Sequence, residues 1–169
     1  MDFIELAAKR SSIRGYKPEP GDEALLGRVL EAGRLAPSAC NRQPYHIVVV
    51  REPAQREALR AAYPRDWFVQ APAILVVCVE PAAAWRRRDG KGYADVDGAI
   101  LMDHLTLAAA DLGLGTCWIG AFAPELVRAA LGLPEGIEPL AMTPLGWPAV
   151  AGQPKQRKAA AEIVHHERW

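Results

Sequence analysis

The sequence predicts an α+β fold in a single domain. With 169 residues, the chain has the length of one ordinary domain, and half of its residues are hydrophobic. Apolar positions recur at helical spacing in some segments and form short β-branched runs in others, without the strict alternation of strand and helix that a parallel sheet requires. Because no repeat or linker divides the chain, we expect residues 1–169 to form one domain.

The first two elements are predicted to be helices. Asp2 followed by Glu5 has the pattern of a capping box, which predicts a short helix through about Lys9. Asp22 is the expected N-cap of a second helix, because apolar residues recur at helical spacing after it until Pro37 stops the pattern.

Two buried strands with a helix between them are predicted next. Residues 45–50 (YHIVVV) form a β-branched run, and residues 73–79 (AILVVCV) carry apolar side chains on both faces. Residues 53–62 are predicted to be a helix with proline at its first position. Residues 81–91 are charged, and we expect them to form a loop.

A long helix central to the core is predicted at residues 93–112, which carry a broad apolar face. Asp95 and Asp97 stand at its start, where their charges suit the helix dipole.

The last elements are two strands, a helix between them and a tail. Strands are predicted at 116–120 and at 139–146, where the prolines of the second favour an edge position or a bulge. Residues 124–131 are predicted to be a short helix that ends at a glycine. The tail, about residues 150–169, is polar, yet it is too apolar to be purely disordered, so we expect it to pack on a second subunit. Its apolar residues are Ile163, Val164 and Trp169.

Charge and composition exclude several classes of protein. Twenty basic and twenty acidic residues give a formal net charge of zero, which argues against a nucleic-acid binder. No apolar run is long enough to span a membrane, and the charged N-terminus lacks the apolar core of a secretion signal. The three cysteines form no C-x-x-C pair, so reduced thiols in a cytoplasm are expected. No spacing of Cys, His and carboxylates predicts a metal site.

Serine and asparagine are scarce, and they cluster. The only serines are Ser11, Ser12 and Ser38, and Asn41 is the only asparagine. GC-rich coding explains a composition with fifteen arginines and five lysines, but it does not explain the clustering. These positions are therefore the first candidates for a binding site.

Two basic segments are candidates for binding a phosphate. Residues 10–14 (RSSIR) place two guanidinium groups around two hydroxyls just after a helix, and arginine binds phosphate with two parallel hydrogen bonds. Residues 154–158 (PKQRK) add three cations near the end of the chain. Together they suit a dianion, whereas each alone could equally be a solvated basic segment.

Two further segments suit a flat ligand. Residues 37–44 (PSACNRQP) form a proline-bounded loop with donors and acceptors for the edge of a planar heterocycle, although a plain helix-to-strand turn is the alternative. Residues 112–120 (LGLGTCWIG) contain G-x-G, but they leave a helix and enter a strand, the reverse of a dinucleotide fingerprint. A Rossmann site is therefore rejected, and these glycines would instead let a flat ligand approach the backbone.

Taken together and in this order, the segments resemble the nitroreductase family of flavoproteins. The matching pieces are RSSIR at 10–14, APSACNRQP at 36–44, GLGTCWIG at 113–120, PLGWP at 144–148 and PKQRK at 154–158. The set spans nearly the whole chain, whose compact length resembles the shorter, single-domain members. The resemblance implies an α+β fold with a central, mostly antiparallel sheet flanked by helices, and FMN bound at the interface of an intertwined homodimer.

The resemblance also implies which residues hold the flavin. The residues expected at its phosphate and ribityl end are Arg10, Ser11, Ser12, Lys155 and Arg157. Those expected around the isoalloxazine ring are Arg14 at the pyrimidine edge, the backbone of Ile119 and Gly120 facing N5, and Gly146 close by. Those expected from the other subunit are Pro37, Ser38 and Asn41.

The activity implied is that of an NAD(P)H-dependent flavin oxidoreductase, which reduces nitroaromatics, quinones or similar acceptors by a ping-pong, two-electron mechanism. No side chain need act as an acid or base, because the cofactor carries the chemistry. Trp67 and Phe68 are candidates for lining the acceptor site. Two alternatives stay open: specialised flavin chemistry such as reductive dehalogenation, and a flavin-binding or sensing dimer without turnover.

Overall fold

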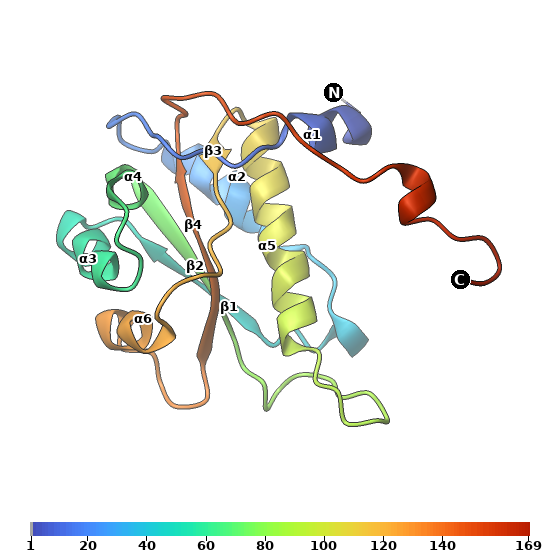
Figure 1. Ribbon diagram of the computed structural model, residues 1–169. Helices are drawn as coiled ribbons and strands as arrows, with labels where there is room; N and C mark the ends of the chain where they lie inside the picture. Colours follow the sequence, from blue (N-terminus) through green and yellow to red (C-terminus); the bar gives the residue numbers. More distant parts are fainter. Residues whose placement is uncertain (1) are drawn as a thin grey trace.

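A four-stranded antiparallel sheet with helices on both faces forms the body of the protein (Figure 1). The computed structural model describes residues 2–169, so Met1, the first residue of the predicted domain, lies outside the described residues. The strands, in their order across the sheet, are β1 (Tyr45–Val50), β2 (Ala73–Val79), β4 (Glu138–Gly146) and β3 (Gly115–Thr116). The predicted α+β class is confirmed.

The helices follow the predicted order, with two changes in the middle of the chain. The α-helices are α1 (Phe3–Lys9), α2 (Glu23–Arg34), α3 (Pro53–Ala58), α4 (Asp66–Gln70), α5 (Ala94–Asp111) and α6 (Pro124–Leu131). The predicted helix at 53–62 divides into α3 and a single 3-10 turn at Leu59–Ala61. The five-residue helix α4 was not predicted. None of the helices in residues 2–169 is long and apolar enough to cross a membrane.

The predicted helix ends are confirmed by their hydrogen bonds. Asp2 Oδ1 accepts the N–H of Glu5 at 2.8 Å, and the Glu5 carboxylate accepts the N–H of Asp2 at 2.9 Å, which completes the capping box of α1. Asp22 caps α2 through the N–H of Ala24 at 2.8 Å. At the end of α6, Gly132 has the left-handed conformation (φ 61°) that glycine adopts at little cost.

The central strand β2 divides the core into two layers because its side chains alternate between the faces of the sheet. Leu75 and Val77 pack with α2 and α5 on one face. Ile74 and Val76 pack on the other face, against residues of α4 and α6. Figure 1 shows this arrangement, with α2 and α5 on one side of the sheet and α3, α4 and α6 on the other.

The predicted strand at 116–120 is wrong over most of its length, and a proline in the neighbouring strand explains why. β3 pairs with β4 only at Gly115 and Thr116. Because Thr116 lies opposite Leu145, the same register places Cys117 opposite Pro144, which has no N–H to donate. The hydroxyl of Thr143 instead accepts the N–H of Cys117 at 3.0 Å.

The prolines of residues 139–146 do not place that strand at an edge, so this part of the prediction is wrong. β4 lies between β2 and β3. The expected bulge is present, because the register of β2 against β4 shifts between Val77 and Cys78, where Pro139 is paired. A central strand tolerates its prolines here because the pairing on its β3 side is short and interrupted.

Candidate functional site

Three segments that are distant in the sequence meet at one end of the sheet. The N–H of Ile13 donates to the carbonyl of Thr116 at 2.8 Å, which joins the RSSIR segment to β3. The N–H of Ala149 donates to the carbonyl of Gly15 at 2.9 Å, which joins the same segment to the chain that follows β4. Both basic segments predicted from the sequence are thereby brought together.

A cationic cavity of about 190 Å³ lies between these segments. The residues that line it are Arg10, Ser11, Ser12, Arg14, Gln153, Pro154, Lys155, Gln156 and Arg157. Within the described part of the chain, no acidic side chain lines this cavity. All six residues predicted from the two basic segments therefore face one small space, with their charges uncompensated by a carboxylate.

The charges in this cavity repel one another. Partial desolvation lowers the pKa of Lys155, and the positive charges of Arg10 and Arg157 lower it further. The ammonium group finds a hydrogen-bond acceptor in the carbonyl of Ala7, near the end of α1. A set of cations that disfavour one another is suited to binding an anion, which would relieve the repulsion.

The backbones of residues 119 and 120 differ in their exposure and in their hydrogen bonding. Ile119 is buried, and its N–H donates to the carbonyl of Met142 at 2.8 Å. Gly120 is exposed, and a Cβ added there would meet no atom within 4 Å. A ligand that approaches this backbone therefore meets open space at Gly120, whereas the N–H of Ile119 is already engaged.

Gly146, the last residue of β4, has a packing role. It is buried, and a Cβ added to it would lie 2.5 Å from Pro72 Cδ. Since real Cβ atoms do not approach other atoms so closely, this glycine allows Pro72 to pack against the end of the strand.

The predicted loop residues Pro37, Ser38 and Asn41 lie far from the cationic cavity. Their loop is tied to the start of α5, where Asp97 accepts the N–H of Ala39 at 2.9 Å. Arg10 and Ser11 instead border a small cavity with Ala110 and Gly113, at the other end of α5. Thirteen residues of α-helix separate these ends by about 20 Å. Figure 1 shows this separation, with α1 and β3 at one end of α5 and the cyan loop before β1 near the other.

Trp67 and Phe68, the residues predicted to line the acceptor site, both lie in α4. Phe68 is fully buried and packs edge-on against Tyr63, with ring centroids 5.4 Å apart, so the prediction that it lines an open site is wrong. Trp67 is half-buried and also meets Tyr63 edge-on, at 5.8 Å.

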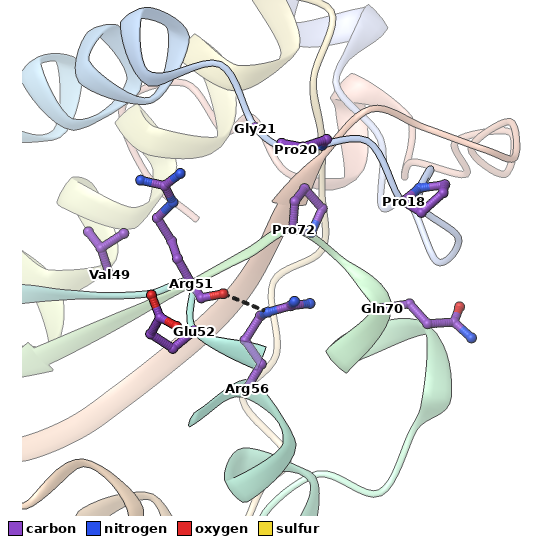
Figure 2. Close-up of a pocket in the computed structure, with 9 residues that line it drawn as sticks. All are labelled: Pro18, Pro20, Gly21, Val49, Arg51, Glu52, Arg56, Gln70 and Pro72. Atoms are coloured by element: carbon purple, nitrogen blue, oxygen red, sulfur yellow. Dashed lines mark hydrogen bonds between the residues drawn. The ribbon is translucent and has the colours of Figure 1, made fainter. Parts of the chain in front are cut away.

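A larger cavity of about 640 Å³ was not predicted (Figure 2). It is lined by Pro18, Pro20, Gly21, Val49, Arg51, Glu52, Arg56, Gln70 and Pro72. Its cations are already engaged: Arg56 donates to the carbonyls of Val69 at 2.7 Å and Ala71 at 2.6 Å, and Arg51 pairs with Glu23. No sequence motif joins its three contributing segments. The cationic cavity is therefore the stronger candidate for a binding site.

Comparison with known proteins agrees with the fold and the segments. The model of the nitroreductase family matches residues 7–63 and 59–147. A NADH dehydrogenase of Thermus thermophilus is 35% identical over 195 residues, covering 97% of this chain and 95% of that protein. A protein of Bacillus subtilis named FMN reductase (NAD(P)H) is 28% identical, covering 99% of this chain and 74% of its own length.

Solved structures give the same result. The crystal structure of a nitroreductase family protein from Clostridium difficile 630 superimposes with a TM-score of 0.90 at 34% identity, over the full length of both chains. Fold, ordered segments and family model thus agree over most of the sequence. The chain belongs to the nitroreductase family.

Proposed function

We propose that this protein is an FMN-dependent oxidoreductase that takes electrons from NAD(P)H and reduces nitroaromatics, quinones or similar acceptors. The observation that carries the proposal is the cationic cavity, in which Arg10, Lys155 and Arg157 converge from opposite ends of the chain. The phosphate of FMN carries about two negative charges at neutral pH, which three or four cations can balance. The likeness to the Bacillus subtilis FMN reductase and the Thermus thermophilus NADH dehydrogenase supports the same cofactor and donor.

The residues of the cavity fit a phosphate ester. Ser11 and Ser12 supply hydroxyl donors beside the guanidinium of Arg10, and Lys155 adds an ammonium whose pKa is lowered by desolvation and by its cationic neighbours. Binding of a dianion would remove the repulsion that lowers this pKa. The resemblance and the geometry therefore support the same set of residues for binding the phosphate.

Bound FMN would supply the two-electron chemistry, accepting hydride from NAD(P)H and then delivering electrons to the acceptor in a ping-pong cycle. The chain's own part is to bind and orient the cofactor. Arg14 is exposed at the same cavity, where its charge would stabilise negative charge on the pyrimidine edge of the ring. The open surface at Gly120 leaves room for a flat ring against the backbone.

We infer that two chains share each site. The loop with Pro37, Ser38 and Asn41 lies about 20 Å along α5 from the phosphate-binding residues, so one chain does not place both sets around one ring. Exposed apolar side chains at both ends of the chain support such pairing. They include Phe3 (67% exposed), Ile4 (75%), Ile163 (63%) and Trp169 (99%).

The proposal also includes packing of the C-terminal tail on a partner subunit and a cytoplasmic location. In Figure 1 the red tail extends past α1 and away from the sheet, which suits a segment of the single domain that packs on a partner subunit. A cytoplasmic location is supported by the cysteines, because Cys40, Cys78 and Cys117 are all free.

Identification of the cofactor tests the proposal directly. The purified protein should be yellow and release FMN on denaturation, or bind added FMN in equimolar amount per chain. In anaerobic stopped-flow experiments, NADH or NADPH should bleach the flavin absorbance, and a quinone or nitroaromatic should restore it. A protein that neither carries nor binds FMN would contradict the proposal. Binding without bleaching by either nucleotide would favour a flavin-binding dimer without turnover.

A further inference from the structure

The loop before β1 holds an unusual backbone conformation. Cys40, Asn41 and Gln43 all have positive φ angles, of 50°, 52° and 51°, although none of them is glycine. Such angles are disfavoured for residues with a side chain and persist only where surrounding contacts impose them. The loop must therefore be held in place by other groups.

Contacts within the loop and from its flanks supply part of that support. Ser38 Oγ accepts the N–H of Gln43 at 2.9 Å, and the amide of Gln43 donates to Asn41 Oδ1 at 3.0 Å. The hydroxyl of Tyr45 donates to the carbonyl of Ala36 at 2.9 Å. These bonds join residues that are close in sequence, and the N–H of Glu80, which follows β2, donates to the carbonyl of Pro44 at 2.9 Å and so fixes the end of the loop to the sheet.

Asp97 provides a long-range contact from a side chain to the first part of the loop. Its Oδ1 accepts the N–H of Ala39 at 2.9 Å, across 58 residues of sequence. Asp97 is 1% exposed, and its second oxygen, Oδ2, has no hydrogen-bond partner among the described residues. Burial of a carboxylate with an unpaired oxygen costs free energy. A favourable interaction with the helix dipole therefore does not by itself explain why an aspartate stands at this buried position. Asp95, exposed in the same first turn of α5, already serves the dipole.

We propose that Asp97 is a positioning residue for the flavin site: by holding Ala39, it keeps Ser38 and Asn41 in the conformation that reaches the flavin of the partner subunit. This inference rests on the proposed function, because it takes the loop as part of that site. A hydrogen bond to a carboxylate is stronger than one to a neutral acceptor, which suits an anchor beside the strained residues of the loop.

Four variants test the anchor from both of its ends. Asp97→Ala removes the acceptor, and Asp97→Asn keeps an oxygen that can accept the same N–H. Ala39→Pro removes the donor without touching Asp97; proline is tolerated at the first position of the 3-10 helix that Ala39 begins. Asp95→Asn, which removes an exposed charge from the same helix turn, is the matched control.

Two measurements are made on each variant. Hydrogen exchange of the segment 37–44 is followed in protein freed of flavin, and the Kd for FMN is obtained from flavin fluorescence. We expect Asp97→Ala and Ala39→Pro to speed exchange in this segment and to weaken FMN binding about tenfold. Asp97→Asn should stay within about threefold of the unaltered protein, and Asp95→Asn should be unchanged. The double variant Asp97→Ala/Ala39→Pro should be no weaker than either single variant, because both remove one bond.

The results separate this inference from the proposed function. If the unaltered protein binds no FMN, the proposed function fails and the flavin role of Asp97 fails with it. If FMN binds, but Asp97→Ala keeps full affinity and unchanged exchange, only the positioning role is overturned. Additive losses in the double variant would also overturn it. If Asp97→Ala does not fold, Ala39→Pro measured against Asp97→Asn decides the question.

Discussion

Ser11 occupies the space that a side chain at residue 152 would need. A Cβ added to Gly152 would overlap Ser11 Oγ and lie 2.5 Å from Ser11 Cβ. The tail therefore crosses the RSSIR segment in direct contact with it, and this crossing carries Lys155 and Arg157 to the side of Arg10.

Gly152→Ala tests this crossing. We expect the added methyl group to push the tail off Ser11, which would disperse the cations and weaken FMN binding about tenfold. The fold itself should persist, since the tail contributes little to the buried core. Gly27→Ala is the control, because a Cβ on this exposed residue of α2 meets nothing within 4 Å. Equal FMN affinity in both variants would show that the contact does not position the tail.

Removal of Arg10 and Arg157, two of the cations proposed to hold the phosphate, should release the flavin. In Arg10→Ala/Arg157→Ala, the loss of two charge-assisted contacts is expected to weaken FMN binding about a hundredfold or more. Flavin content by absorbance and mass by light scattering measure cofactor and assembly separately, and the protein should stay folded with its assembly unchanged. Arg88→Ala, at an exposed residue outside the cavity, should keep its flavin. Full retention of FMN in the double variant would refute the phosphate assignment.

The lowered pKa of Lys155 predicts how the stability of the flavin-free protein depends on pH. Desolvation and the neighbouring arginines make the folded protein bind this proton less tightly than the unfolded chain does. Between the lowered pKa and the ordinary value of 10.5, the unfolded chain binds more protons, so this group makes stability rise with pH.

Thermal melts from neutral pH to pH 10, compared with those of Lys155→Gln, isolate this contribution. Inorganic phosphate should raise the melting temperature of the flavin-free protein most at neutral pH, where all the cations are charged. The substitution should reduce the phosphate effect and flatten the pH dependence. Identical curves for the two proteins would contradict the prediction.

The hydroxyl of Thr143 should stabilise the break in the pairing of β3. This fully buried side chain accepts the N–H of Cys117 at 3.0 Å and donates to the carbonyl of Pro144 at 2.9 Å. Thr143→Val keeps the shape but leaves the Cys117 N–H unpaired, which should cost about 1–3 kcal/mol in the free energy of unfolding. Thr143→Ser keeps the hydroxyl and should lose less. Urea unfolding of the three proteins measures the difference, and a loss in Thr143→Val no larger than that in Thr143→Ser would contradict the prediction.

The three cysteines should differ sharply in reactivity. Cys40 is exposed, whereas Cys78 and Cys117 are buried. Burial raises the pKa of Cys78 to about 11 and also raises that of Cys117, so both remain thiols at pH 8. Titration of the native protein with a thiol reagent at pH 8 should therefore modify Cys40 alone, and Cys40→Ala should abolish the fast reaction. Rapid modification of a second thiol would show that the core around Cys78 or Cys117 opens to solvent.

Much of the secondary structure could be predicted because it depends on local rules. Asp2 with Glu5, Asp22 and Gly132 mark helix ends through bonds to residues a few positions away. The central helix follows from its apolar pattern, and β1 and β2 follow from short β-branched and apolar runs. The strand predicted at 116–120 failed because its interruption depends on Pro144, which lies opposite it only in the folded sheet.

In the candidate site, too, some features follow from the local sequence and others arise only in the folded protein. The cationic character of the cavity follows from the residue types at 10–14 and 154–158, which can be read from the sequence. That these two segments face each other, that Phe68 is buried, and that the loop with Ser38 lies at the opposite end of α5 all depend on the fold. The difference between Asp97 and Asp95 also needed the fold: both lie in the first turn of α5, but Asp97 is buried and accepts the N–H of Ala39, whereas Asp95 is exposed. Charge and hydrogen-bonding capacity belong to the residue, whereas burial and proximity arise from packing between residues far apart in the chain.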